Sequence, residues 1–347
     1  MAKTVRENDR LRKIVEAFPK TTVAVLGDLV ADEFVFGEIS RVSREAPVLI
    51  LKHRDRKVVP GGAANAICNL ADLSVTVLPV GVVGDDEPGR LLLRAFRHRR
   101  IPVSGVLKDK SYSTVTKTRI LAGFAHTAGQ QVVRLDREPA EGPNSHLRRE
   151  LVLATREYAR AADALLVSDY GYGAATPALL NAVREKRGID KVPVTLDSRH
   201  RMLQFSGITA ATPNEAEVEE ILGIRVGNDW NRLVAAGEQV VGEMKLESLL
   251  ITRGKDGMVA FPRRHRAIDL PIFGSDEVAD VTGAGDTVIA TFTAALAAGA
   301  DTEEAAHLAN YAGGIVVMKR GTATVSPDEL RAAVRSDPDF ETRLASR

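Results

Sequence analysis

The stretch Asp280-Val281-Thr282-Gly283-Ala284-Gly285-Asp286-Thr287 is a glycine-rich turn that runs directly into an apolar, helix-forming segment, residues 288–298. Two glycines and an alanine let the backbone turn tightly, because no bulky side chain stands in the way. The first N–H groups of the predicted helix lack intrahelical partners and lie at the positive end of its dipole, which suits phosphate oxygens. The alternative is a plain turn in which Asp286 caps a helix.

On both sides of this turn, apolar strand patterns alternate with helical patterns. The first strand covers residues 22–28, and further strands are predicted at 75–80, 164–167, 192–196, 208–211, 249–252 and 258–261. Helices are predicted at 63–71, 89–98, 144–161, 176–186, 215–222, 229–244, 286–298 and 302–319. This alternation predicts an α/β fold with a doubly wound, mostly parallel sheet flanked by helices.

Two segments do not fit a central parallel strand. Residues 34–59 and 106–135 alternate apolar and polar side chains and carry many charges, so we expect strands with one exposed face. Together they predict a small β-sheet that stands off the main body. We expect residues 1–20 to be a polar lead-in helix, residues 21–335 to be one large domain, and residues 336–347 to be a tail.

The overall composition argues against several classes of function. Lys+Arg 47 against Asp+Glu 46 gives a net charge of +1, which provides no field for nucleic acid or an anionic membrane. No stretch approaches the roughly 18 consecutive apolar residues of a membrane span, so we expect a cytoplasmic protein. The single cysteine, Cys68, excludes an intramolecular disulfide, and the histidines show no zinc spacing. No P-loop motif occurs.

In a doubly wound sheet, ligands bind beyond the carboxyl ends of the strands, so the residues that follow each strand are informative. Asp28 and Asp32 follow the first strand and suit pairs of sugar hydroxyls, although solvated acids on a surface turn would look the same. Gly61, Gly62 and Asn65 open a helix where backbone can approach a ligand closely. Small residues needed only for packing are the alternative there.

A second group of residues suits a nucleotide. Asn214 and Glu217 lie three residues apart at the start of a helix, where they could touch phosphate and a hydrated Mg²⁺ or form a simple capping box. The run Thr252-Arg253-Gly254, followed by Gly257, could meet phosphates or form an ordinary hairpin turn. Asn310 could contact adenine or be a routine surface amide.

An anion site beside a carboxylate is what phosphoryl transfer to a hydroxyl requires. The N–H groups of the turn would steady the phosphoryl group, and Asp286 would take the proton of the alcohol. The sequence therefore predicts a kinase that acts on a small molecule.

The chain resembles the ribokinase-like, or PfkB, family of carbohydrate kinases over residues 21–335. The residues that carry the resemblance are Gly61-Gly62-Ala63-Ala64-Asn65 and the run from Asp280 to Asp286. The resemblance implies a β-sheet lid over the sugar, formed by the exposed strands near 34–59 and 106–135, and use of ATP with Mg²⁺. It also implies a homodimer paired through the lid, and it leaves open whether a monovalent cation such as K⁺ is needed.

The same resemblance implies roles for individual residues. Asp286 would be the catalytic base, and Gly283, Ala284 and Gly285 the anion hole. The sugar contacts would be Asp28, Asp32, Gly61, Gly62 and Asn65. The nucleotide contacts would be Asn214, Glu215, Ala216, Glu217, Thr252, Arg253, Gly254, Gly257 and Asn310, with Glu217 holding the metal through water.

Within the family, the chain is most similar to bacterial D-glycero-D-manno-heptose 7-phosphate kinases. The segments that carry this likeness are residues 39–48, 168–173 and 321–327. Those kinases tend to have Lys at the position of Tyr172 and an Asp-Pro-Lys run where this chain reads Asp197-Ser198-Arg199. The likeness implies phosphorylation of an anomeric hydroxyl of the heptose phosphate.

Other functions remain alternatives. The first is a nucleoside or fructose-phosphate kinase of the same fold. The second is a sugar-binding regulator that has lost catalysis, which retention of Asp286 and the glycine turn disfavours. A nicotinamide-dependent oxidoreductase is excluded, since no G-x-G-x-x-G follows the first strand.

Overall fold

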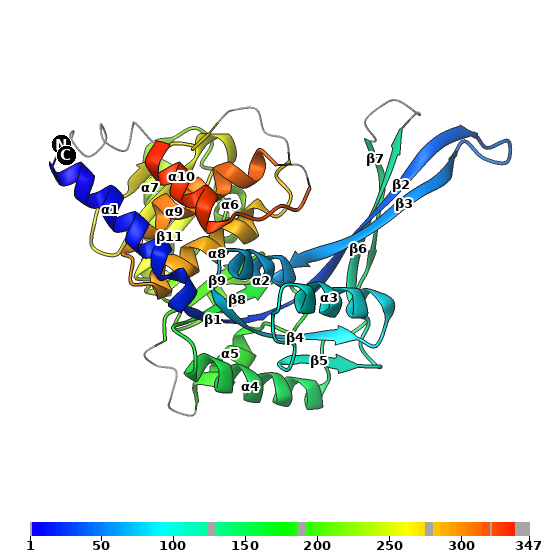
Figure 1. The fold of residues 1–347 in the computed structure, drawn as a ribbon, viewed down its shortest axis with the longest axis horizontal. Helices are drawn as coiled ribbons and strands as arrows, with labels where there is room; N and C mark the ends of the chain where they lie inside the picture. The colour runs from blue at the N-terminus through cyan, green and yellow to red at the C-terminus, as the bar shows by residue number, and fades with distance from the viewer. Residues whose placement is uncertain (1, 124–129, 186–191, 275–279, 320, 337–347) are drawn as a thin grey trace.

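A mostly parallel sheet forms the centre of the molecule (Figure 1). The computed structural model describes residues 2–123, 130–185, 192–274, 280–319 and 321–336. Within these residues, nine strands follow the order β13-β12-β11-β10-β9-β8-β1-β4-β5. Their bounds are β1 Thr22–Gly27, β4 Thr76–Gly84, β5 Val106–Asp109, β8 Ala164–Asp169, β9 Val194–Ser198, β10 Ala210–Ala211, β11 Ser248–Thr252, β12 Met258–Pro262 and β13 Ile268–Leu270. Among the described strands of this sheet, the pairs β11–β12 and β12–β13 are antiparallel and the other pairs are parallel.

Helices cover both faces of this sheet, which confirms the predicted doubly wound α/β fold. One face packs against α1 Ala2–Ala17, α2 Ala63–Asp72, α3 Glu87–His98, α8 Ala284–Ala297, α9 Thr302–Val317 and α10 Pro327–Ser336. The other packs against α4 Ser145–Arg160, α5 Pro177–Arg184, α6 Glu215–Leu222 and α7 Trp230–Met244. Three short 3₁₀ helices, η1 Phe18–Lys20, η2 Met202–Gln204 and η3 Gly254–Asp256, complete the elements of the described part of the chain.

The alternation of side chains along each strand explains why helices pack against both faces of the sheet. In β1, Val23 and Val25 join the core on one face, whereas Ala24 and Leu26 join the core on the other. Side chains along a strand point alternately to opposite faces, so an uninterrupted apolar run is buried on both. This is the pattern that the sequence of residues 22–28 predicts.

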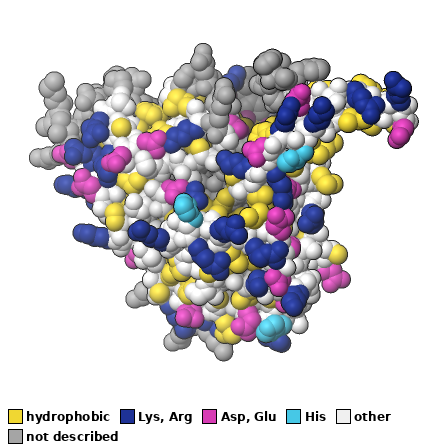
Figure 2. Space-filling model, turned by 45° about the vertical axis from the view of Figure 1, so that its right-hand side comes forward, with side chains coloured by type: hydrophobic (Ala, Val, Ile, Leu, Met, Phe, Trp, Pro, Cys, Tyr) yellow, Lys and Arg dark blue, Asp and Glu magenta, His cyan; other side chains and the backbone are white. Residues whose placement is uncertain are grey.

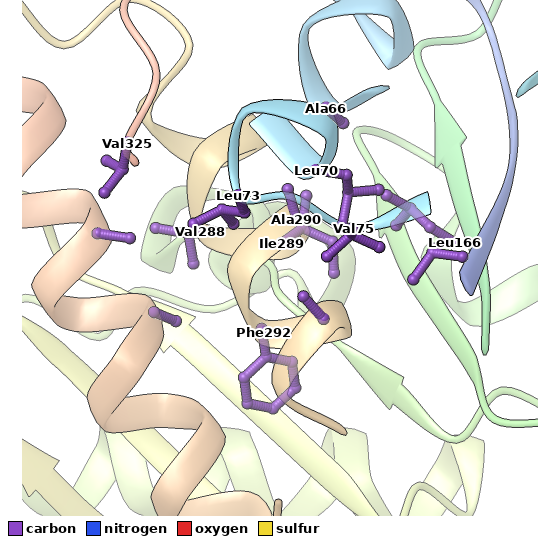
Figure 3. Packing of buried hydrophobic residues seen from close by; sticks show 14 of the residues in the cluster. Ala66, Leu70, Leu73, Val75, Leu166, Val288, Ile289, Ala290, Phe292 and Val325 are labelled. Atoms are coloured by element: carbon purple, nitrogen blue, oxygen red, sulfur yellow. The ribbon is translucent and has the colours of Figure 1, made fainter. Parts of the chain in front are cut away.

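Helix α8, which begins in the glycine turn, is buried along most of its length. Figure 3 shows Val288, Ile289 and Phe292 of this helix among Leu70 of α2 and Leu166 of β8. A helix that is apolar on all sides needs neighbours on all sides. The hydroxyls of the buried Thr291 and Thr293 donate to backbone carbonyls one turn earlier in the helix, and the hydroxyl of Thr287 donates to Asn69 Oδ1 at 2.9 Å.

A second sheet projects from the body (Figure 1). It consists of β2 Leu29–Val42, β3 Leu49–Gly62, β6 Val115–Gly123 and β7 Gln130–Arg137, in the order β3-β2-β6-β7. β2 pairs antiparallel with β3 and parallel with β6, and β7 pairs antiparallel with β6. The predicted small sheet is confirmed. We refer to these four strands as the small sheet.

The structure corrects the predicted extent of this sheet. Residues 106–109, which the sequence pattern assigns to it, form β5 and pair with β4 at the edge of the large sheet. The reason is burial: Val106 packs into the main core, whereas the strands of the small sheet keep an exposed face.

Some elements differ from the predicted ones at their ends or were not predicted. β13 and α10 have no counterpart among the predicted elements, and α1 packs Leu11, Ile14 and Val15 into the main core instead of remaining a polar lead-in. The end of the helix predicted at 176–186 and residues 337–347 of the predicted tail lie outside the described residues. Among the described residues, no helix combines the length and the apolar character needed to cross a membrane.

Candidate active site

A cavity of about 490 Å³ lies where the carboxyl ends of β8, β9, β10 and β11 meet the base of the small sheet and the start of α8. Its lining joins residues that are far apart in sequence, including Asp32, Asn65, Tyr170, Asp197 and Asp286. The position agrees with the rule that open α/β sheets bind ligands beyond their strand ends. It is also the edge at which the sequence predicts a site.

Asp286 lies in the first turn of α8 and is only 5% exposed, yet it lines the cavity. Its Oδ2 accepts a hydrogen bond of 2.8 Å from Asn65 Nδ2, and its Oδ1 accepts one of 2.8 Å from the Tyr170 hydroxyl. Burial raises the pKa of Asp286 to about 6, although both hydrogen bonds oppose that rise. The carboxylate is therefore a base of moderate strength in a largely dry site.

The glycine turn holds Asn65 against this carboxylate. Gly283 has a φ of +78°, and a Cβ on it would lie 2.4 Å from Asn65 Nδ2. Only glycine fits both conditions. Gly283 and Gly285 line the cavity, whereas the N–H of Ala284 donates to the carbonyl of Val281 at 3.2 Å. Of the three predicted anion-hole residues, Ala284 therefore has its N–H occupied within the turn.

The two carboxylates after β1 have different positions. Asp32 lines the cavity and accepts a hydrogen bond of 2.5 Å from Arg119 Nη1 of β6. Gly61 lies behind it, since a Cβ there would fall 2.1 Å from Asp32 Oδ2. Asp28 does not line the cavity: its oxygens accept the backbone N–H groups of Tyr170, Tyr172 and Ala174 at 2.8–3.0 Å. The structure therefore places Asp28 behind the turn that follows β8 and not in the lining of the cavity.

The predicted nucleotide residues are divided between two adjoining cavities. Asn214, Glu217 and Thr252 line the larger one. A second cavity of about 170 Å³ shares Thr252, Val281 and Gly285 with it and is mostly apolar. The predicted residues that line the second cavity are Thr252, Gly254, Gly257, Ala284, Gly285 and Asn310. Asn310 is 4% exposed and donates to the Pro271 carbonyl at 2.7 Å, so it is not a surface amide.

Three predicted nucleotide residues line neither cavity. Arg253 Nε pairs with Glu215 Oε2 at 3.0 Å, and Ala216 is exposed on α6. Asn214 and Glu217 do form the capping box that was the alternative interpretation. Glu217 nevertheless lines the cavity, and burial raises the pKa of its carboxyl.

Among the described residues, the cavity is also lined by four cationic side chains that no sequence pattern predicted as a group: Lys117, Arg119, Arg134 and Arg199. Lys117 and Arg119 alternate along β6, and Arg134 lies opposite Arg119 in register. Asp32 lies opposite Lys117, so one face of the small sheet points these groups at the cavity. Period-2 alternation around Asp32 is the signal that could have found them.

Tyr170 is a further lining residue to which no sequence pattern assigned a role. Its hydroxyl reaches Asp286, while Lys117 Nζ lies 5.4 Å and the Arg199 guanidinium 5.8 Å from the centre of its ring. No spacing rule predicts this contact, because β8 and α8 are separated by more than 100 residues.

Solved structures of low sequence identity share this fold. The structure of Arabidopsis thaliana ribokinase complexed with ribose and ATP superposes with a TM-score of 0.73 at 20% identity, covering 91% of this chain and 99% of that chain. Escherichia coli phosphofructokinase-2 in complex with substrates and products gives a TM-score of 0.72 at 17% identity, covering 91% and 98%. The fold therefore places the chain among the ribokinase-like α/β proteins.

Sequence comparison then identifies the family. Residues 20–329 match the family described as pfkB family carbohydrate kinase. Bifunctional protein HldE of Geobacter metallireducens is 41% identical over 307 residues, covering 88% of this chain and 61% of the relative. Bifunctional protein HldE of Haemophilus ducreyi is 38% identical over 320 residues, covering 91% and 64%.

The chain belongs to the pfkB family of carbohydrate kinases, as its resemblance predicts. Membership implies ATP as the phosphoryl donor. The chain spans a little over three fifths of the length of the two HldE relatives.

Proposed function

We propose that this chain transfers the γ-phosphoryl group of ATP to the anomeric hydroxyl of a sugar phosphate, D-glycero-D-manno-heptose 7-phosphate, and forms the 1,7-bisphosphate. One observation carries the proposal: the buried carboxylate of Asp286 shares its cavity with the cationic side chains of Lys117, Arg119, Arg134 and Arg199. A kinase for neutral sugars or nucleosides has no need of that charge on the acceptor side. The resemblance to heptose 7-phosphate kinases points to the same substrate.

Lys117 is the strongest candidate for binding the 7-phosphate. It is 7% exposed, and the structure gives it no carboxylate partner within ion-pair distance among the described residues. Burial, together with the charges of Arg199 and Arg134, lowers the pKa of its ammonium group. An isolated buried charge is unfavourable, and a phosphate dianion would relieve both the desolvation and the repulsion.

In the proposed reaction, the oxygen of the acceptor hydroxyl attacks the γ-phosphorus atom of ATP, and Asp286 accepts the proton of that hydroxyl. The bond between that phosphorus and the β–γ bridging oxygen breaks, and ADP leaves. The N–H groups at the start of α8, where Gly283 provides no side-chain cap, would hold the transferring oxygens. The Asp32 carboxylate, which is paired with Arg119, would also accept hydrogen bonds from hydroxyls of the sugar and so orient it.

On the donor side, the mostly apolar cavity beside Asn310 would take the adenine. Glu217 fits a hydrated Mg²⁺, because one of its oxygens caps α6 while the carboxyl lines the cavity. Asp197 lines the same cavity, and burial, followed by the charges of Asp286 and Glu217, raises its pKa well above the usual value. The metal would neutralise charge on the phosphates.

We also propose that residues 21–335 act as one kinase domain with the small sheet as its lid, and that two copies pair through the lids. Val133 and Leu135 lie on the face of the small sheet opposite to Arg134 and are 51% and 66% exposed. Figure 2 shows hydrophobic side chains beside Lys and Arg along the projecting part of the molecule. The need for ATP places the proposed reaction in the cytoplasm.

A coupled assay of ADP release tests the substrate directly. The acceptors are D-glycero-D-manno-heptose 7-phosphate, the unphosphorylated heptose, fructose 6-phosphate and adenosine, each with ATP and Mg²⁺. We expect kcat/KM to be highest for the heptose phosphate and at least about 10-fold lower without the phosphate, as expected for loss of a charged hydrogen bond. Equal turnover of unphosphorylated acceptors would overturn the proposed substrate.

The same assay separates the remaining alternatives. Tight sugar binding without acceptor-dependent ADP release would identify a regulator in place of an enzyme. Repeating the assay with Na⁺ in place of K⁺ tests for a monovalent cation.

A further inference from the structure

The segment from Tyr170 to Ala174, which follows β8, is held more firmly than a surface turn requires. The Asp28 carboxylate accepts three of its backbone N–H groups, those of Tyr170, Tyr172 and Ala174, at 2.8–3.0 Å. On the other side, Asp169 accepts the N–H of Gly171 at 3.0 Å and the Ser198 hydroxyl at 2.7 Å. Asp28 and Asp169 are 1% and 2% exposed, so two buried carboxylates fix this turn.

The turn presents the Tyr170 hydroxyl to Asp286. The Tyr170 oxygen lies 2.8 Å from Asp286 Oδ1, and Asn65 Nδ2 lies 2.8 Å from Oδ2. An ionised carboxylate has about four lone-pair sites, so one donor on each oxygen leaves the others for a ligand in the cavity. The phenol must be the donor, because burial and then the charge of Asp286 raise the pKa of Tyr170 well above its usual value.

We propose that Tyr170 is a positioning residue that orients Asp286 and favours its ionised form, and that Asp28 acts at one remove by fixing the turn that carries Tyr170. This inference rests on the proposed role of Asp286 as the base. During the reaction Tyr170 keeps its proton, and the proton of the acceptor passes to Asp286.

Other charged groups face Asp286 and must be considered with Tyr170. Asp32 from β2 raises its pKa and Lys117 from β6 lowers it. Asp197 at the end of β9 is a further carboxylate that interacts with Asp286, and Arg199 lies over the Tyr170 ring. All four remain when only the hydroxyl of Tyr170 is removed, so a change seen in that variant belongs to the hydroxyl.

The test is the pH profile of kcat for Tyr170→Phe, measured with saturating ATP and heptose 7-phosphate. Loss of a donor to a charged group should move the acid limb up by about one to two pH units. At pH 6, where about half of the wild-type Asp286 is ionised, we expect a fall in kcat of about 5- to 50-fold. The difference should narrow above pH 8, where Asp286 of the variant is ionised again. Both KM values should stay within about twofold, because the aromatic ring is retained.

Tyr172→Phe is the matched control. It removes a hydroxyl from the same turn, under the same lysine, but that hydroxyl bonds to Glu138 at 3.2 Å and not to Asp286. Its pH profile should match that of the wild type. A Tyr170→Phe profile that equals the wild-type profile, or that falls by the same factor at every pH, would overturn the inference.

Two further variants make the result decisive. If Tyr170→Phe does not fold, as judged by its Tm, Asp28→Asn serves instead, since it loosens the turn and should shift the acid limb in the same direction by a smaller amount. An unshifted Asp28→Asn profile would then count against the inference. Asp286→Asn separates failure of the proposed base from failure of the inference about Tyr170. If Asp286→Asn retains activity, the assignment of Asp286 as the base is wrong. If Asp286→Asn is inactive and the pH profile of Tyr170→Phe is unshifted, only the inference about Tyr170 fails.

Discussion

Asp286 has two properties that usually conflict: it is buried, and it must carry charge. Neutral donors from Asn65 and Tyr170 meet its two oxygens, and a pKa of about 6 leaves it mostly ionised at neutral pH. Its raised pKa also makes it a better proton acceptor than an ordinary aspartate. As the pH falls through about 6, protonation of Asp286 should therefore reduce activity.

Lys117 gives the residue-scale test of the acceptor phosphate. Replacing it with alanine removes a charged donor from the cavity, so we expect KM for heptose 7-phosphate to rise about 10- to 100-fold. KM for ATP should change little. At pH 8, where Asp286 stays ionised without help from Lys117, kcat should remain within a few-fold of the wild-type value.

Lys52→Ala is the matched control for this measurement. Lys52 lies on β3 of the same small sheet but is exposed and does not line the cavity. Steady-state kinetics on both variants settle the point. An unchanged KM for the sugar phosphate in Lys117→Ala would contradict the assigned phosphate contact.

At the scale of elements, the sequence predicts the parts whose signal is local. The apolar run at residues 22–28 and the all-apolar helix after Asp286 each determine their own burial, and both form where predicted. β5 was assigned to the wrong sheet, because pairing between Val106–Asp109 and β4 depends on a partner that no local pattern reveals. The short strand β13 was missed for the same reason.

In the candidate site, too, residues with a local sequence signal could be predicted, whereas contacts between distant elements could not. The carboxylates and glycines after the strands could be predicted, because strand ends meet at one edge of the sheet. The bond from Tyr170 to Asp286 joins two elements through three-dimensional packing, and the burial of Lys117 depends on where the small sheet lies. Asp28 was predicted as a sugar contact from its position after β1, and that position could not show that three N–H groups of a distant turn donate to its carboxylate.

The glycine turn before α8 gives the element-scale prediction. Gly283→Ala must adopt a left-handed φ and also displace Asn65 from Asp286, so we expect at least a 100-fold loss of kcat, on the scale of general-base catalysis, and a lower Tm. Gly299→Ala, just beyond the C-terminal end of the same helix, has a φ of +85° and open space around its Cβ.

Comparison of these two variants separates backbone strain from damage to the site. Each should lose about 1–2 kcal/mol of folding free energy from the left-handed backbone alone. Only Gly283→Ala should lose activity. Normal turnover in Gly283→Ala would show that the contact between Asn65 and Asp286 is dispensable.

For the whole molecule, the two faces of the small sheet have different consequences. One face supplies Lys117, Arg119 and Arg134 to the cavity, and the other exposes Val133 and Leu135. The second face also carries the ion pair between Arg56 and Glu33, so its exposed apolar area is limited to side chains such as Val133 and Leu135, which a cover would remove from water. A second copy of the chain would provide this cover. Because the same sheet lines the cavity, formation of the proposed dimer would also affect the geometry of the site.

Leu135→Glu tests that arrangement. A charge at the centre of an apolar interface is strongly unfavourable, so we expect the variant to be monomeric where the wild type is dimeric. Leu153→Glu, at a position 54% exposed on α4, should leave the dimer intact. Light scattering after size exclusion, at one concentration for all three proteins, decides between these outcomes. A wild-type monomer, or a dimer in Leu135→Glu, would contradict pairing through the lid.

The central claim is that the carboxylate of Asp286 takes the proton of the acceptor. The most direct measurement compares wild type and Asp286→Asn by single-turnover phosphoryl transfer at pH 8, with ATP affinity measured separately by calorimetry. We expect the rate to fall by about 10²–10⁴-fold, the usual scale for a general base, while the Kd for ATP changes by less than about threefold. A rate within a few-fold of the wild type, with ATP still bound, would contradict the claim.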